Sequence, residues 1–325
     1  MIFDVFKKRE LKAMKIQSSG KPIDILLVED NPGYVQWFKK NLSKSKVGRY
    51  DLRFTRKLDE TIKYLEEKQC DIVMLDTSLP DSQGYNTFNS VRLHAPKTPI
   101  IVMAGNNDEE LAVQTLQNGA QDCLIKGQID GTVLRRSIRY AIERHNATQR
   151  QHRLAYFDAL TNLPNRQLFH DRLNQAMSLA DRYDEKVGLL FIDLDGFKDV
   201  NDSMGHDMGD HLLQAVAVRL KECLRKSDTV ARIGGDEFTC ILPHLEKASD
   251  VNAVAGKIDR ALTTPFFLEG HEIQISGSIG ASLFPDNTVD SQELIKKADT
   301  AMYHAKNQQK SNFHFFREEK IKVRL

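Results

Sequence analysis

The sequence has little cysteine and no long apolar segment. Its four cysteines (Cys70, Cys123, Cys223 and Cys240) are widely spaced, and none belongs to a CxxC pair or a cysteine–histidine cluster. A zinc site and a disulfide framework are therefore disfavoured, and a reducing, cytoplasmic compartment is expected. The longest apolar runs, such as residues 187–192, fall far short of the roughly 20 residues that a membrane-crossing helix needs. We therefore expect no membrane partner.

The chain also lacks a charge excess. Lys and Arg number 46 and Asp and Glu number 45, which gives a formal net charge of +1. Without a basic footprint or a recognisable DNA-reading element, a nucleic-acid partner and a transcription factor are disfavoured. Residues 1–20 have mixed charge and lack the apolar centre of a signal peptide, so we expect an N-terminal arm.

What is present suits two domains, since 325 residues with 41% apolar content can build two cores. Short apolar runs alternate with amphipathic stretches over residues 21–130. This pattern predicts an α/β domain with a doubly wound parallel sheet. The expected strands cover residues 25–28, 52–55, 72–75, 100–103 and 123–125. Residues 131–156 keep a fading apolar stripe and are predicted to form a connecting helix, or stalk, able to pair with a second copy.

The second half of the chain orders its expected strands and helices differently. Residues 157–318 are predicted to form an α+β domain with an antiparallel central hairpin hinged at Gly234 and Gly235, followed by a tail over 319–325. The expected helices cover 167–179, 209–224, 248–262 and 291–305, and the expected strands cover 187–193, 229–233, 238–242 and 273–283.

Charged residues follow three expected strands of the first domain. Glu29 and Asp30 follow the first strand, Asp76 the third and Lys126 the fifth. Because the carboxyl ends of parallel strands meet at one edge, these side chains should converge there. Carboxylates in one shallow pocket suit Mg²⁺, and a carboxylate beside that cation and an ammonium can accept a phosphoryl group.

The segments ILLVEDNP, IVMLDTSLPDSQG, PIIVMAG and GAQDCLIKG, within residues 21–144, resemble the response-regulator receiver family. The resemblance implies that Asp76 is the phosphoacceptor and that Lys126 contacts the phosphate. It also implies one Mg²⁺ held by Glu29, Asp30 and the Ser78 carbonyl, and a histidine kinase or phosphotransfer protein as partner.

Two positions depart from the receiver pattern. Ala104 stands where the family has a hydroxyl residue, and Cys123 stands where it has an aromatic switch residue. We expect phosphorylation of the receiver to be chemically intact. The hydroxyl and aromatic side chains that usually respond to the phosphate are both missing.

A second group of carboxylates lies in the other domain. LLFIDLDGFKDVND places Asp193 and Asp195 at the end of an apolar strand, and ARIGGDEFTCIL places Asp236 and Glu237 after two glycines. The glycines permit a tight turn and close approach of a ligand to the backbone. If the hairpin pairs beside the first strand, the carboxylates surround the two cations that phosphoryl chemistry needs. The plainer alternative is a hairpin with an acidic tip.

This domain resembles the GGDEF diguanylate cyclase family along its whole length. The matching segments are DALTNLPNR, IDLDGFKDVNDSMGHDMGDHLL, SGSIGASLFP and ADTAMYHAK, in order and at family spacing. The resemblance implies conversion of two GTP into cyclic di-GMP and two pyrophosphates by a homodimer, with two Mg²⁺ or Mn²⁺ ions in the site.

The resemblance also implies roles for single residues. Asp193, the Leu194 carbonyl, Asp236 and Glu237 would hold the metals, and Asp236 would also accept a proton. Substrate contacts would come from Asn201 and Asp210 on guanine, Lys306 and Lys310 on the triphosphate, and Gly234 and Gly235 in the turn. An Asp carboxylate can accept from guanine N1–H and N2–H₂, a donor edge that adenine lacks.

Arg225 and Asp228 match the RxxD inhibitory site of the same family, which implies inhibition by cyclic di-GMP. The second contact of that site is Lys257 or Arg260, and the sequence leaves both open. An alternative function is a catalytically silent GGDEF domain that senses cyclic di-GMP or GTP, although the signature residues are intact. The short stretch after Phe316 leads us to expect no phosphodiesterase domain.

Overall fold

A computed structural model describes residues 21–45, 48–105, 108–307 and 313–316. The chain divides into two compact units, Met1–Arg150 and Gln151–Leu325. Within the described residues, none of the helices combines the length and apolar character needed to cross a membrane. The predicted N-terminal arm, the C-terminal tail and Lys310 lie outside the described residues.

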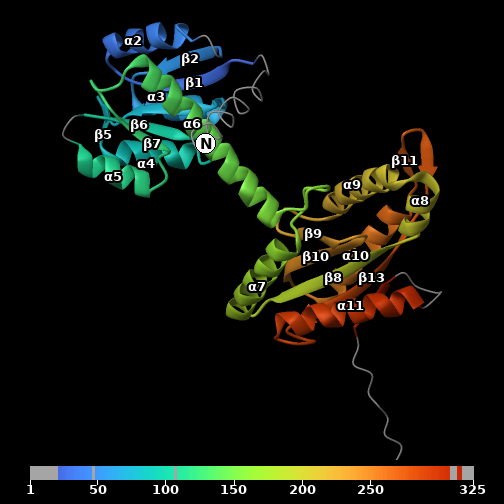
Figure 1. The fold of residues 1–325 in the computed structure, drawn as a ribbon. Helices are drawn as coiled ribbons and strands as arrows, with labels where there is room; N and C mark the ends of the chain where they lie inside the picture. The colour runs from blue at the N-terminus through green and yellow to red at the C-terminus, as the bar shows by residue number, and fades with distance from the viewer. Residues whose placement is uncertain (1–20, 46–47, 106–107, 308–312, 317–325) are drawn as a thin grey trace, which may run out of the picture. The chain divides into compact units, whose positions relative to one another are not determined.

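The first unit has a five-stranded parallel sheet in the order β2-β1-β3-β6-β7 (Figure 1). Its strands are β1 (Ile23–Val28), β2 (Tyr50–Thr55), β3 (Ile72–Asp76), β6 (Ile100–Ala104) and β7 (Asp122–Ile125), and a small hairpin joins β4 (Ser78–Leu79) to β5 (Ser82–Gln83). Its helices are α2 (Pro32–Ser43), α3 (Leu58–Glu67), α4 (Tyr85–His94), α5 (Glu109–Gln117) and the start of α6 (Gly131–Tyr156). The predicted doubly wound parallel sheet is confirmed.

Successive side chains of each strand point to opposite faces of the sheet, and this explains why helices cover both faces of the first unit. Ile25 and Leu27 of β1 pack with α2 and α6, whereas Leu26 and Val28 pack with α3 and α4. Successive strand residues point to opposite faces, so one apolar run supplies both cores. β3 and β6 are buried along their whole length, as expected for strands covered on both faces.

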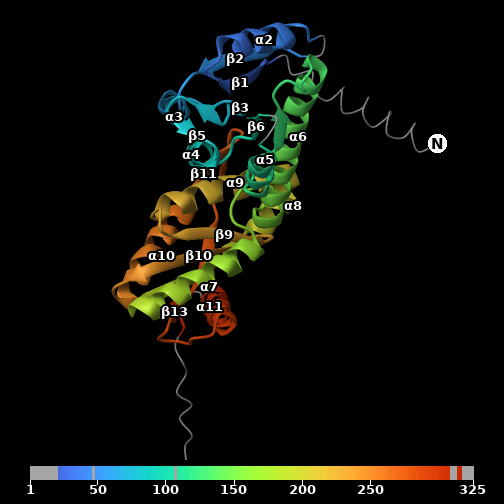
Figure 2. The same cartoon turned by 90° about the vertical axis from the view of Figure 1, so that its left-hand side faces the viewer.

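The second unit has a five-stranded mixed sheet in the order β14-β13-β8-β10-β9, with β8 in the middle (Figure 1) and the hairpin β9–β10 on one side (Figure 2). Its strands are β8 (Lys186–Asp195), β9 (Thr229–Gly234), β10 (Glu237–Leu245), β13 (Ser276–Phe284) and β14 (Phe313–Phe315), with a separate hairpin of β11 (Phe266–Leu268) and β12 (His271–Ile273). Its helices are α7 (Arg166–Tyr183), α8 (Phe197–Met204), α9 (His206–Cys223), α10 (Ala248–Thr263) and α11 (Ser291–Asn307). The predicted α+β class is confirmed.

The strand predicted over residues 273–283 is wrong in its extent. β12 ends at Ile273 and pairs with β11, whereas β13 begins at Ser276 and pairs with β8. Ile273 and Ile275 are both buried, so the apolar alternation continues while the chain changes its pairing partner.

The two faces of β8 meet different helices. Leu190, Ile192 and Leu194 pack in the core with α9 and α10. Val187, Leu189 and Phe191 pack in the core with α7 and α11. Position 193 therefore belongs to the face that α7 and α11 cover.

Candidate functional site

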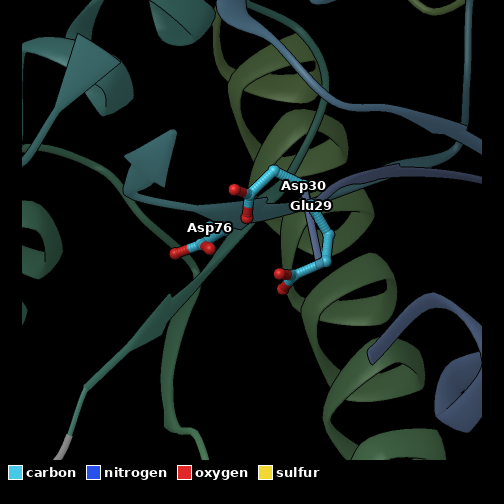
Figure 3. Close-up of side chains that lie close together, drawn as sticks. All are labelled: Glu29, Asp30 and Asp76. Carbon is cyan, nitrogen blue, oxygen red and sulfur yellow. The ribbon is translucent and has the colours of Figure 1, made fainter. Parts of the chain in front are cut away.

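Three carboxylates meet at the carboxyl edge of the first sheet. Glu29 and Asp30 follow β1 and Asp76 ends β3, and one oxygen of each lies within 4.8 Å of the others (Figure 3). Glu29 and Asp76 are buried and Asp30 is exposed. The structure thus brings together the acidic residues that the strand ends predicted.

Lys126, one residue beyond β7, compensates the buried charge. Its Nζ lies 2.6 Å from Asp76 Oδ2 and 2.8 Å from Glu29 Oε2, and 4.8 Å from the centre of the Tyr34 ring. Burial and the nearby Asp76 raise the pKa of Glu29, against the effect of Lys126. Burial lowers the pKa of Lys126, but its hydrogen bonds to Asp76 and Glu29 outweigh this and raise it.

The donor set of this edge fits a hard divalent cation, because it offers carboxylate oxygens only and leaves Asp30 open to solvent. Ser78 lies beside it, where its amide N–H donates to Asp76 Oδ1 at 3.0 Å. This hydrogen bond orients the carboxylate of Asp76.

The two departures from the receiver pattern lie next to this edge. Ala104 ends β6 and is buried, so its methyl group offers no hydroxyl to a phosphate. Cys123 is half-buried on β7 and packs against the core on the α3–α4 side. Burial raises the pKa of the Cys123 thiol to about 11, so the group is a neutral thiol near neutral pH.

A second acidic group lies in the middle of the other sheet. Glu237 of β10 is the cross-strand neighbour of Asp193 on β8, and the Leu194 amide donates to the Asp236 carbonyl at 3.3 Å. Lys306 of α11 donates from Nζ to Asp193 Oδ1 at 2.6 Å, because α11 covers the face on which position 193 lies. The hydrogen bond to Asp193 raises the pKa of Lys306.

Asp299 is a functional candidate that sequence reasoning missed. The pKa of Glu237 is raised by burial, then by the charges of Asp193, Asp299 and Asp236. Burial and Asp193 likewise raise the pKa of Asp299. A signal was available, since Asp299 precedes Lys306 on α11 by about two helical turns and so shares its face. Among the described residues, however, only the receiver carboxylates lie close enough together to hold one ion as they stand.

Asp195 is held differently from Asp193. Its carboxylate accepts hydrogen bonds from Ser278 Oγ at 3.0 and 3.1 Å and from Ser276 Oγ at 3.1 Å. Both serines lie on β13, so Asp195 ties two strands together.

The glycine turn of the hairpin β9–β10 is open. Gly235 has a φ of +51°, a conformation that favours glycine. Among the described residues other than the adjacent ones in the chain, no atom lies within 4 Å of where a Cβ of Gly234 or Gly235 would stand. Gly234, unlike Gly235, does not have a positive φ, so the fold itself does not require glycine at position 234. Close approach of a ligand to the backbone would require it.

The predicted guanine readers lie on two adjoining helices. Asn201 is on α8, and Asp210 is exposed in the first turns of α9, next to Gly209. A Cβ on Gly209 would stand 1.9 Å from Asn201 Oδ1. Glycine at 209 therefore lets the Asn201 side chain lie against α9, a role that the sequence did not reveal.

Arg225 and Asp228 form a tight turn between α9 and β9. The Arg225 amide donates to Asp228 Oδ2 at 2.8 Å, and the Asp228 amide donates to the Arg225 carbonyl at 3.1 Å. Both residues line a pocket of about 520 Å³. Lys257 also lines this pocket, whereas Arg260, the other candidate for the second contact, is not among its lining residues. Lys257 Nζ also donates to the last carbonyls of α9, from Glu222 and Cys223, at 3.1 and 3.0 Å.

Family profiles match both units. Residues 25–139 match the response regulator receiver domain, and residues 155–312 match the diguanylate cyclase GGDEF domain. The chain is therefore a receiver domain followed by a GGDEF domain, which confirms both resemblances.

Two relatives from Pseudomonas aeruginosa match about half of this chain. MucR of Pseudomonas aeruginosa, a bifunctional diguanylate cyclase/cyclic di-GMP phosphodiesterase, is 42% identical over 193 residues, which are 59% of this chain and 28% of MucR. The diguanylate cyclase TpbB of the same organism is 41% identical over 155 residues, which are 47% of this chain and 36% of TpbB. This chain therefore spans about a third of the length of these relatives.

A solved structure shares the fold of the second unit. The coiled coil and GGDEF domain of DgcB from Caulobacter crescentus, in complex with c-di-GMP, is 27% identical to this chain. The match covers 56% of this chain and 96% of that one, with a TM-score of 0.50.

Proposed function

We propose that this protein is a diguanylate cyclase that condenses two GTP into cyclic di-GMP and two pyrophosphates under the control of its receiver domain. The observation that carries the proposal is the pairing of Asp193 with Glu237 beside Lys306, next to an open glycine turn. Relatives named as diguanylate cyclases share this domain. The proposed boundaries are 21–130 for the receiver, 131–156 for the stalk and 157–318 for the cyclase, in a cytoplasmic protein.

Each half-reaction joins a 3′-hydroxyl oxygen to the α-phosphorus of the other GTP. The bond from that phosphorus to the β-phosphate bridging oxygen breaks, and pyrophosphate leaves with the electron pair. The hydroxyl proton passes to the Asp236 carboxylate, which lies in the turn beside Glu237. Since each domain holds one GTP and the product needs two, the working form is a homodimer.

Two Mg²⁺ or Mn²⁺ ions would be held by the carboxylates of Asp193, Asp236 and Glu237 and the carbonyl of Leu194, and would neutralise phosphate charge. Lys306 pairs with Asp193 when no nucleotide is bound. When GTP binds, its ammonium moves to the triphosphate, which Lys310 also contacts. Asn201 and Asp210 bind the guanine edge, so ATP is rejected.

The receiver is proposed to bind one Mg²⁺ at Glu29, Asp30, Asp76 and the Ser78 carbonyl. Asp76 then takes a phosphoryl group from a histidine kinase or phosphotransfer protein, and Lys126 contacts the phosphate. The preformed contact of Lys126 with Asp76 supports this assignment.

Cyclic di-GMP is proposed to inhibit the enzyme at Arg225 and Asp228. Arg binds guanine or phosphate through paired hydrogen bonds, and the pocket beside the turn adds Lys257 rather than Arg260. Inhibition curves for added product should shift to higher concentration in Arg225→Ala, with an unchanged initial rate.

The test of the function is direct. Purified protein is incubated with Mg²⁺ and either GTP or ATP, with and without beryllofluoride, and the nucleotides are separated by chromatography. Cyclic di-GMP from GTP alone is the expected result. Binding of GTP or cyclic di-GMP with no turnover in any condition would instead identify a sensor module.

A further inference from the structure

One arginine links the glycine turn to the segment that follows the stalk. Arg232 on β9 has only 12% of its side chain exposed. Its Nε and Nη2 donate to the Gly235 carbonyl at 2.9 and 2.8 Å, and its Nη1 donates to the Asp158 carboxylate at 3.0 and 3.2 Å. One planar guanidinium therefore binds both partners at once.

A bulge in the hairpin brings Arg232 to the turn. Gly234 pairs with Glu237, but Phe238 pairs with Arg232, so Ile233 is an extra residue in β9. Such a bulge redirects neighbouring side chains and is common next to active sites.

The bonded carbonyl controls the position of a reacting group. The Gly235 carbonyl and the Asp236 amide belong to one rigid peptide plane. Two hydrogen bonds to that carbonyl therefore fix the direction in which the chain enters Asp236, and with it the start of the Asp236 side chain. Glycine at 235 supplies no stiffness of its own, so the restraint comes from Arg232.

The other partner is itself fixed. Asp158 Oδ1 accepts from the Thr161 amide at 2.8 Å and from Thr161 Oγ1 at 2.6 Å, and the Asp158 amide donates to the Leu163 carbonyl at 2.8 Å. Burial raises the pKa of Asp158, but the hydrogen bonds from Thr161 and Arg232 prevail and lower it. Asp158 is thus an anion held in one orientation.

The same segment is tied to the end of α6. The Asn165 amide donates to the Tyr156 carbonyl at 2.9 Å, and Asn165 Nδ2 donates to the Ala155 carbonyl at 2.8 Å. The Arg232 amide donates to the Pro164 carbonyl at 3.0 Å. Hydrogen bonds, together with the backbone of residues 163–165, therefore connect the last turn of α6 through Asp158 to the glycine turn.

We propose that Arg232 is a positioning residue of the cyclase, which sets the glycine turn and makes its geometry depend on the segment after α6. This inference rests on the proposed cyclase function. Loosening the turn displaces Asp236, whereas Asn201 and Asp210 on other elements still bind guanine. The expected signature is a lower kcat with a nearly unchanged KM.

The test uses Arg232→Lys and Asp158→Asn in the full chain. Lysine keeps a positive charge near Asp158 but cannot donate in parallel to the Gly235 carbonyl. We expect kcat to fall about tenfold or more, with KM changed less than about threefold, because small misplacement of a reacting group is costly. The double variant should have a kcat only slightly lower than that of Arg232→Lys, since the two residues act through one contact.

Arg219→Lys is the matched control. Arg219 also binds backbone carbonyls, of Ala261, Thr264 and Pro265, and stacks 3.5 Å from the Phe266 ring centre, but none of these partners belongs to the β9–β10 hairpin. If it lowers thermal stability as much as Arg232→Lys while kcat stays near wild type, loss of stability does not explain the Arg232 effect.

Hydrogen–deuterium exchange gives a readout that does not need turnover. Peptides covering residues 233–238 should exchange faster in Arg232→Lys and unchanged in Arg219→Lys. Wild-type exchange and wild-type kcat in Arg232→Lys would overturn the inference. A wild-type protein that makes no cyclic di-GMP would refute the proposed function instead, and faster exchange in Arg232→Lys would still support its control of the turn.

Discussion

The two acidic sites of this chain use a lysine in opposite ways. Lys126 in the receiver has 17% of its side chain exposed and bridges two carboxylates, of Asp76 and Glu29. Lys306 in the GGDEF domain has 46% exposed and, among the described residues, pairs with the single carboxylate of Asp193. One lysine is built into a buried cluster, and the other rests at the rim of an open site.

This difference follows from the two sheets. Parallel strands bring Glu29 and Asp76 to one buried edge, where a cation must compensate them in every state. In the mixed sheet of the GGDEF domain, Asp193 and Glu237 are cross-strand neighbours on the antiparallel strands β8 and β10, next to an open turn. Asp193 is buried, but nearly half of the Lys306 side chain is exposed, so the solvated ammonium can exchange its carboxylate for a phosphate at modest cost.

Asp236→Ala is expected to have the largest effect. Loss of the proposed proton acceptor and proposed metal-binding carboxylate should lower turnover by at least about a hundredfold, measured as cyclic di-GMP formed from GTP. The receiver should still bind beryllofluoride as wild type does. Asp286→Asn, which removes an exposed partner of Lys186, is the control. Near-normal turnover in Asp236→Ala would remove Asp236 from the site.

The different burial of Lys126 and Lys306 should appear as different losses in the free energy of unfolding when each lysine is replaced. Lys126→Gln leaves buried carboxylates uncompensated and should lower the free energy of unfolding of the receiver by about 3 kcal/mol. Lys306→Gln should lower that of the GGDEF domain by less than about 1 kcal/mol. Urea denaturation with and without Mg²⁺ measures both, and Mg²⁺ should restore part of the loss in Lys126→Gln. Equal losses would show that burial does not separate the two sites.

Gly209→Ala tests the guanine site without touching the carboxylates. A Cβ at 209 would displace the Asn201 side chain, which can swing aside. We expect KM for GTP to rise about tenfold, the value of one lost hydrogen bond to a base. Stability should change by no more than about 1 kcal/mol, since alanine favours a helix. Gly256→Ala on α10, where among the described residues a Cβ would meet the tip of the Arg260 side chain at 3.7 Å, is the matched control.

The smallest effect is expected at the receiver switch. With Ala104 and Cys123 in place, beryllofluoride should change the cyclase rate by less than about fivefold, the lower end of usual allosteric couplings. Ala104→Thr combined with Cys123→Tyr should increase that change, because phosphate then has a hydroxyl to draw inward and a ring to follow it. Cys123→Ala serves as the control. A large response of the unaltered protein, in rate and in dimer mass, would show that these positions are dispensable.

Much of the fold could be predicted from local patterns. The apolar runs that became β1, β3 and β6 are short and flanked by turn residues, and Glu29, Asp76 and Lys126 follow strands whose parallel pairing forces them together. The strand predicted over 273–283 failed because apolar alternation carries no information about which strand is the partner.

The sequence by itself determined the two domain types, the strand ends that carry carboxylates and the glycine turn between Gly234 and Asp236. Only the tertiary structure decided that Lys306 pairs with Asp193, that Lys257 rather than Arg260 lines the pocket of Arg225, and that Arg232 joins Asp158 to the turn. The reason is physical. Strand periodicity and turn residues act over a few neighbours in the chain, whereas these contacts depend on which faces of distant helices and strands pack together.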